Sequence, residues 1–126
     1  MIQTRVMIIE DEELIATLLA EVLETLGYTV SAIAATETEA VTVATHNPPD
    51  LMIVDVYLGE GSGISAVAEI TKSVFVPHVF MTGDRRHVEA YTSGAIVLQK
   101  PFGLDALKFA IARASGRFHN VDADRQ

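Results

Sequence analysis

The chain has 126 residues, enough for one domain at the usual size of about 100–200 residues, with nine Lys and Arg against seventeen Asp and Glu, a formal net charge of −8, and 49% hydrophobic residues. The net negative charge argues against binding to nucleic acid. The hydrophobic content argues against a disordered acidic tail, and the absence of cysteine excludes disulfides and catalysis by a thiolate. The acidic residues at 10–13 predict no signal peptide, and no apolar run approaches the roughly 20 residues of a membrane span. We therefore expect a cytoplasmic monomer without membrane contact.

Short apolar runs and helical patterns alternate along the chain. The expected elements, in chain order, are a strand at 5–9, a helix at 14–26, a strand at 28–33, a helix at 36–46, a strand at 51–54, a helix at 63–70, a strand at 76–81, a helix at 85–93, a strand at 95–98 and a helix at 104–114. Ser62 is a candidate N-cap. We assign Leu14, Leu18 and Leu26 of the first helix to the core.

This alternation predicts an α/β domain with a five-stranded parallel sheet covered by helices on both faces. Residues 1–116 form the expected domain. Residues 117–126 are polar, have no periodicity, and are expected to fray as a tail. In such sheets, functional sites lie at the carboxyl ends of the strands, so the residues that follow each strand are the candidates.

Polar side chains with complementary chemistry follow four of the expected strands. They are Glu10 and Asp11 after the first, Asp55 after the third, Thr82 after the fourth and Lys100 after the fifth. Neighbouring carboxylates repel one another unless a hard divalent cation such as Mg²⁺ lies between them. An aspartate can attack phosphorus to form an acyl phosphate, while a lysine and a metal neutralise the phosphoryl oxygens. These residues therefore predict a phosphoryl-acceptor site.

Four segments at these strand ends resemble the receiver domain of bacterial two-component response regulators. They are VMIIEDE at 6–12, PDLMIVD at 49–55, VFMTG at 79–83 and KPF at 100–102. The resemblance extends over about residues 4–115. It implies a flavodoxin-like fold with strand order 2-1-3-4-5 and five helices, and a stand-alone receiver that signals by phosphorylation.

The resemblance also implies the residues that bind the metal. Asp11, Asp55 and the backbone carbonyl of Tyr57 would bind Mg²⁺ directly, and Glu10 would act through a water molecule. No other cofactor is expected.

Three further roles follow from the same resemblance. Asp55 would be the phosphoacceptor, Thr82 the switch hydroxyl and Lys100 the lysine that pairs with the phosphoryl group. The peptide bond between Lys100 and Pro101 would be cis.

The resemblance implies a phosphohistidine donor on a sensor histidine kinase or a phosphotransfer protein. Residues 77–83 partly resemble a motif of receivers paired with the HWE and HisKA2 kinase classes. The domain would catalyse only the uptake and hydrolysis of its own phosphoryl group. It would signal by docking on an unidentified protein. Val97 stands where the family usually has an aromatic residue, so we expect the switch to run mainly through residues 82–86 and the helix after them.

Two alternatives belong to other functional classes. Val97 favours a protein-interaction module on a receiver scaffold whose output ignores phosphorylation. The other alternative is an aspartyl-nucleophile phosphatase. These enzymes typically have a second aspartate two residues after the nucleophile, and Tyr57 at that position argues against this class.

Overall fold

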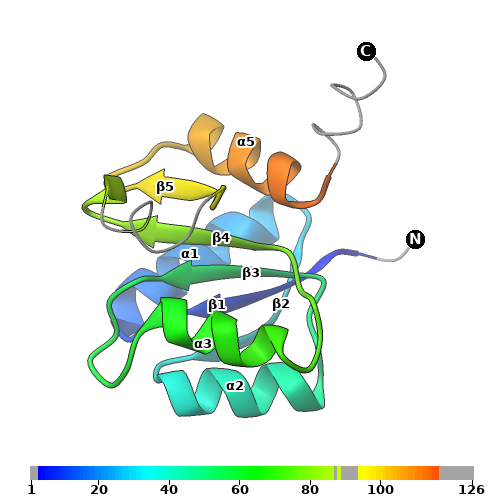
Figure 1. Ribbon diagram of the computed structural model, residues 1–126. Helices are drawn as coiled ribbons and strands as arrows, with labels where there is room; N and C mark the ends of the chain where they lie inside the picture. Colours follow the sequence, from blue (N-terminus) through cyan, green and yellow to red (C-terminus); the bar gives the residue numbers. More distant parts are fainter. Residues whose placement is uncertain (1–2, 87, 89–93, 117–126) are drawn as a thin grey trace, which may run out of the picture.

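The computed structural model describes residues 3–86, 88 and 94–116. Five parallel strands form a single sheet (Figure 1). The strands are β1 (Arg5–Ile9), β2 (Thr29–Ala34), β3 (Leu51–Asp55), β4 (His78–Thr82) and β5 (Val97–Gln99). Their order across the sheet is β2-β1-β3-β4-β5, as the resemblance implied. The central position of β3 places its last residue, Asp55, in the middle of the carboxyl edge.

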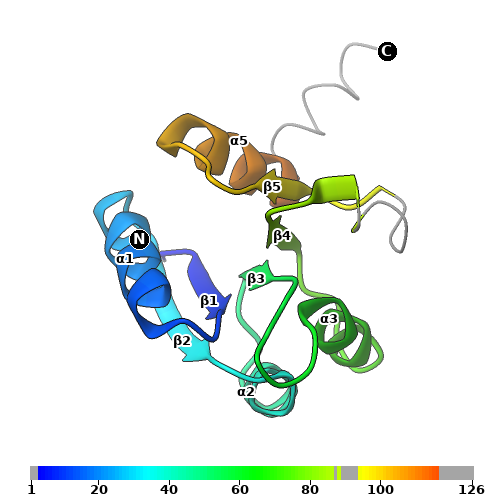
Figure 2. The same ribbon diagram turned by 90° about the vertical axis from the view of Figure 1, so that its left-hand side faces the viewer.

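Four described helices cover the two faces of the sheet. They are α1 (Glu13–Thr25), α2 (Glu37–His46), α3 (Gly63–Thr71) and α5 (Leu104–Ala114). Seen along the strands, α1 and α5 lie on one side of the sheet and α2 and α3 on the other (Figure 2). Most of the helix expected at 85–93, and the tail expected at 117–126, lie outside the described residues. None of the described helices is long and apolar enough to span a membrane.

The central strands β1, β3 and β4 are almost completely buried, and alternate residues of the strands belong to two separate apolar clusters. The first cluster joins Met7, Ile9, Met52, Val54 and Phe80 of the sheet to Ala40 and Ala44 of α2 and Ala66, Val67 and Ile70 of α3. The second joins Val6, Ile8, Leu51, Ile53, Val79 and Leu98 of the sheet to Ala16, Leu19 and Leu23 of α1 and Leu107, Ala110 and Ile111 of α5. This explains why the strands have continuous hydrophobic runs instead of alternating polar residues.

The helix start at Ser62 is confirmed, because its side-chain oxygen accepts a hydrogen bond from the Ser65 N–H at 3.2 Å. Strand boundaries shift slightly from the expected ones. The fourth strand begins at His78 and not at residue 76, because Pro77 has no N–H to donate, although its carbonyl accepts a bond from the Met52 N–H.

The assignment of Leu14 and Leu18 to the core is wrong. Their side chains are 71% and 52% exposed, whereas Leu23 is fully buried and Leu26 is partly buried against the second cluster. The apolar residues of α1 extend around more of the helix than the sheet can cover. At 100° per residue, Leu14 and Leu18 lie on the side of the helix opposite the buried stripe.

Candidate functional site

The strand register brings Glu10 next to Asp55. In the parallel pair of β1 and β3, Ile9 lies opposite Val54, so Glu10 and Asp55 are the next residues along the two neighbouring segments. Side chains alternate along a strand, and Ile53 belongs to the cluster beneath α1 and α5. Asp55 therefore leaves the sheet on the α1 and α5 side, and Glu10 does the same after Ile8.

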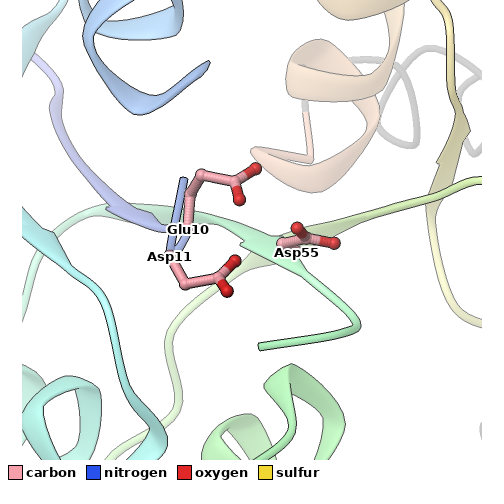
Figure 3. Close-up of side chains that lie close together, drawn as sticks. All are labelled: Glu10, Asp11 and Asp55. Atoms are coloured by element: carbon pink, nitrogen blue, oxygen red, sulfur yellow. The ribbon is translucent and has the colours of Figure 1, made fainter. Parts of the chain in front are cut away.

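Three carboxylates converge at this edge of the sheet. Glu10, Asp11 and Asp55 each offer an oxygen atom, and these atoms lie within 4.8 Å of one another (Figure 3). Glu10 and Asp55 are buried, with exposed fractions of 1% and 7%, whereas Asp11 is exposed. An open pocket of about 390 Å³ lies above Asp11 and Asp55, bordered also by Tyr57 and Lys100. A small anion can therefore reach Asp55 from solvent.

Lys100 neutralises part of this negative charge. Its Nζ lies 3.2 Å from Asp55 Oδ2 and 3.5 Å from Glu10 Oε1. Its backbone N–H donates to the Thr82 carbonyl at 2.7 Å, and the Lys100–Pro101 peptide bond is cis, as expected. The residue that follows the edge strand β5 thus reaches back to the end of the central strand.

Two groups of the cluster, Glu10 and Lys100, have shifted pKa values. Burial raises its pKa from the ordinary 4.5 to about 7, against the opposing effects of the Glu12 backbone N–H and the Lys100 charge. Burial lowers the pKa of Lys100, but the charges of Asp55 and Glu10 outweigh it, so that pKa is raised overall. The lysine therefore stays cationic, while Glu10 lies close to its protonation midpoint at neutral pH.

The three carboxylates fit a hard divalent cation. Mg²⁺ prefers oxygen ligands and retains several waters, which an open pocket with a few carboxylates provides. Glu10 Oε1 is buried and has no hydrogen-bond partner within the described part of the chain, so a water molecule bound to a cation would satisfy it. The backbone carbonyl of Tyr57 remains a predicted ligand. Tyr57 borders the pocket, and its N–H donates to Asp55 Oδ1 at 3.4 Å.

Thr82 is placed differently from the four charged residues. It is buried at the end of β4, and its hydroxyl accepts a hydrogen bond from the Asp84 N–H at 3.1 Å. The structure thus brings Glu10, Asp11, Asp55 and Lys100 together and leaves the Thr82 hydroxyl bonded within its own loop.

Two residues near the site were missed by sequence reasoning. Glu37 Oε1 accepts a hydrogen bond from the Ser62 N–H at 2.9 Å, which fixes the loop after Asp55. Gln99 contacts the loop after β4, where its Oε1 accepts from the Arg85 N–H at 3.0 Å and its amide nitrogen donates to the Gly83 carbonyl. An acidic residue in the first turn of a helix usually reflects the helix dipole, so Glu37 carried no signal of this contact.

The family model described as "Response regulator receiver domain" matches residues 6–112. The chain is 41% identical to the transcriptional regulatory protein PdtaR of Mycobacterium tuberculosis strain H37Rv over 123 residues, which covers 94% of this chain and 60% of PdtaR. It is 39% identical to the phyllosphere-induced regulator PhyR of Methylorubrum extorquens over 106 residues, which covers 79% of this chain and 39% of PhyR. The chain thus spans 60% of PdtaR and 39% of PhyR, less than two thirds of the length of either relative.

Solved structures agree with this similarity. The receiver domain of Erythrobacter litoralis PhyR superposes with a TM-score of 0.79 at 32% identity, covering 89% of each chain. The anti-anti-sigma factor PhyR of Bartonella quintana gives a TM-score of 0.81 at 34% identity, covering 100% of this chain and 53% of that one. With the matching fold and the carboxylate cluster at its sheet edge, this chain belongs to the response regulator receiver domain family.

Proposed function

We propose that Asp55 accepts a phosphoryl group from a phosphohistidine, in a reaction that depends on Mg²⁺. The observation that carries this proposal is the position of the Asp55 carboxylate, which lies in an open pocket beside two further carboxylates and 3.2 Å from Lys100 Nζ. A structural aspartate would need neither the pocket nor the acidic neighbours.

In the proposed step, a carboxylate oxygen of Asp55 attacks the phosphorus atom, and an O–P bond forms as the N–P bond of the phosphohistidine breaks. The imidazole nitrogen keeps the bonding electron pair. Lys100 loses part of its pairing with Asp55 and becomes available to the phosphoryl oxygens, and the Thr82 hydroxyl can turn from Asp84 towards them. Glu10, Asp11, Asp55 and the Tyr57 carbonyl would hold Mg²⁺, which supplies charge neutralisation on the transferred oxygens.

The proposed donor is a sensor histidine kinase or a phosphotransfer protein, of the HWE or HisKA2 class whose receiver motif residues 77–83 partly resemble. The proposed output is a change in binding to a protein partner in the cytoplasm, with no substrate beyond the domain's own phosphoryl group. The name "anti-anti-sigma factor" of the B. quintana relative supports a protein partner over nucleic acid, as does the net charge of −8.

The test combines intact-mass measurement with NMR. A small phosphoryl donor such as acetyl phosphate, given with Mg²⁺, should add one phosphoryl mass to the wild type and none to Asp55→Asn. Beryllofluoride with Mg²⁺ should shift amide resonances around residues 55, 82 and 100. A mass increase that survives Asp55→Asn would place the chemistry elsewhere and refute the proposal.

The phosphorylation-independent module remains the second candidate because of Val97. This side chain is half-buried and packs against the cluster beneath α2 and α3, where it cannot supply the aromatic ring that the family usually has. Under this alternative, Asp55→Asn would leave partner binding unchanged even though wild-type Asp55 takes up the phosphoryl group.

A further inference from the structure

The loop between β3 and α3, residues 56–62, borders the acidic pocket and has glycine at positions 59 and 61. Its base is closed by an antiparallel bridge between Tyr57 and Ser62 and by a hydrogen bond of 2.9 Å from the Gly63 N–H to the Val56 carbonyl. Glycine-rich loops lose much conformational entropy when they are ordered. The position of the Tyr57 carbonyl therefore depends on contacts that the loop makes with the rest of the protein.

Glu37, the first residue of α2, makes two such contacts. Its carboxylate Oε1 accepts a hydrogen bond from the Ser62 N–H at 2.9 Å, and its backbone N–H donates to the Glu60 carbonyl at 3.2 Å. One residue at the start of a helix on the α2 and α3 face thus binds both a donor and an acceptor of the loop. The start of α2 is itself fixed, because the Thr36 hydroxyl caps it through the Glu39 N–H.

The side chain of Glu37 also packs directly on the loop. Gly61 has a φ of +86°, and a Cβ atom at this position would lie 2.5 Å from Glu37 Cβ and 2.6 Å from its Oε1. The absence of a side chain at position 61 allows the carboxylate to approach the Ser62 N–H. The contact is therefore both packed and hydrogen-bonded.

Asp11 holds the other side of the same loop. Its Oδ2 accepts a hydrogen bond from the Gly59 N–H at 2.8 Å, and it belongs to the carboxylate cluster with Asp55. A bound cation would compete with the Gly59 N–H for the charge of Asp11. Glu37 lies outside the residues that border the pocket, so it can hold the loop whether or not a cation is bound.

We infer that Glu37 is a positioning residue, which holds the 56–62 loop so that the Tyr57 carbonyl and Asp11 present their oxygens to a divalent cation. The inference deepens the proposed function and rests on it, since it requires that Mg²⁺ binds in this pocket. Glu37 itself touches neither the cation nor the phosphoryl group. Its effect passes through Ser62, Glu60 and the loop.

The experiment titrates the full chain with MgCl₂ and follows backbone amides by NMR. In Glu37→Ala the Mg²⁺ dissociation constant should rise by about tenfold, the effect typical of losing a residue that orients a metal ligand. Glu37→Gln keeps the Oε1 acceptor and should stay within about twofold of the wild type. Glu60→Gln removes one negative charge from the same loop without touching the contact, and serves as the matched control for charge.

A second measurement does not involve the metal. Hydrogen exchange of the Ser62 amide in the Mg²⁺-free protein should be faster in Glu37→Ala than in the wild type, and unchanged in Glu60→Gln. Wild-type affinity in Glu37→Ala would overturn the inference, as would equal weakening in Glu37→Ala and Glu37→Gln, which would reduce the effect to charge. If the wild type itself bound no Mg²⁺, the proposed function would fail first, a result distinct from failure of the Glu37 role alone.

Discussion

Glu10 is the residue at which protonation would compete with the proposed binding of Mg²⁺. It is 1% exposed, and its Oε2 accepts a hydrogen bond from the Glu12 N–H at 3.2 Å. Its Oε1 lies 3.5 Å from the Lys100 ammonium and has no hydrogen-bond partner among the residues that the structure describes. With a pKa of about 7, the metal-free carboxyl is roughly half protonated at neutral pH. Because carboxylates must be ionised to bind a metal, the proposed Mg²⁺ affinity would depend on pH through this group.

We therefore predict that Mg²⁺ binds about tenfold more weakly at pH 6 than at pH 8. A carboxyl with a pKa of about 7 is ionised to roughly one tenth at the lower pH and nine tenths at the higher one. The measurement is an NMR or calorimetric titration at both pH values. Glu10→Gln cannot ionise and should lose most of this dependence. The same pH slope in Glu10→Gln and in the wild type would contradict the prediction.

The stability of the metal-free protein should depend on the same group. The folded-state pKa of Glu10 is raised above its unfolded value of 4.5, so the folded state binds the proton more tightly. Its contribution to the free energy of unfolding is fully present below pH 4.5 and is lost as the pH rises through about 7. Urea unfolding at pH 5 and pH 8 should show a wild-type loss that exceeds that of Glu10→Gln by about 1–3 kcal/mol. Parallel pH profiles for the two proteins would argue against a raised pKa of Glu10 in the folded state.

At the scale of elements, α3 begins against the backbone of β3. A Cβ atom at Gly63 would lie 2.0 Å from the Asp55 carbonyl oxygen and 2.7 Å from Val54 Cγ1, both of which belong to the central strand. The φ of Gly63 is not in the left-handed region, so the constraint is space alone. The first turn of α3 and the peptide group of Asp55 are thus in direct contact.

Gly63→Ala should destabilise the protein by about 3 kcal/mol, because a buried strand and a helix must move apart to accommodate one methyl group. Gly83→Ala is the matched control, since a Cβ there meets nothing within 4 Å and its φ is not positive. Urea unfolding of both variants measures the difference. Equal stabilities would mean that the start of α3 can shift at little cost.

At the scale of the whole molecule, the sheet separates two apolar clusters, and α1 carries more apolar surface than its side of the sheet can bury. Leu18 is 52% exposed and borders a groove of about 290 Å³ together with Ile15, Phe102 and Leu104. Leu23, on the other side of the same helix, is fully buried against the strands. The sheet-facing stripe therefore carries the stability that α1 provides.

Leu23→Ala should cost about 2–5 kcal/mol of unfolding free energy, the range for a buried leucine, whereas Leu18→Ala should cost less than about 1 kcal/mol. Both changes remove the same atoms from the same helix, so helix propensity does not separate them. Chemical denaturation compares the two directly. Similar losses would show that the outer face of α1 is covered in solution.

The fold and the charged part of the site could be predicted because both follow from local patterns. Strand-length apolar runs, their regular alternation with helices, and polar residues at their ends predict a parallel sheet with Glu10, Asp55 and Lys100 at one edge. The strand order that makes β1 and β3 neighbours was implied by the family resemblance. The exposure of Leu14 could not be predicted, because apolar periodicity does not say how wide a strip the sheet covers. The Glu37 contact with Ser62 could not be predicted either, since it joins positions 25 residues apart through the path of a loop.

The two charged partners at the centre of the pocket are attached to strands of very different local stability. Asp55 ends β3, which is paired with strands on both sides, whereas Lys100 follows β5, a strand of three residues that pairs with β4 alone. Edge segments with few backbone hydrogen bonds open at lower free energy than central strands. A brief fraying of β5 would carry the ammonium away while the aspartate stays in place, leaving the carboxylates without their counter-charge in a molecule that is otherwise fully folded.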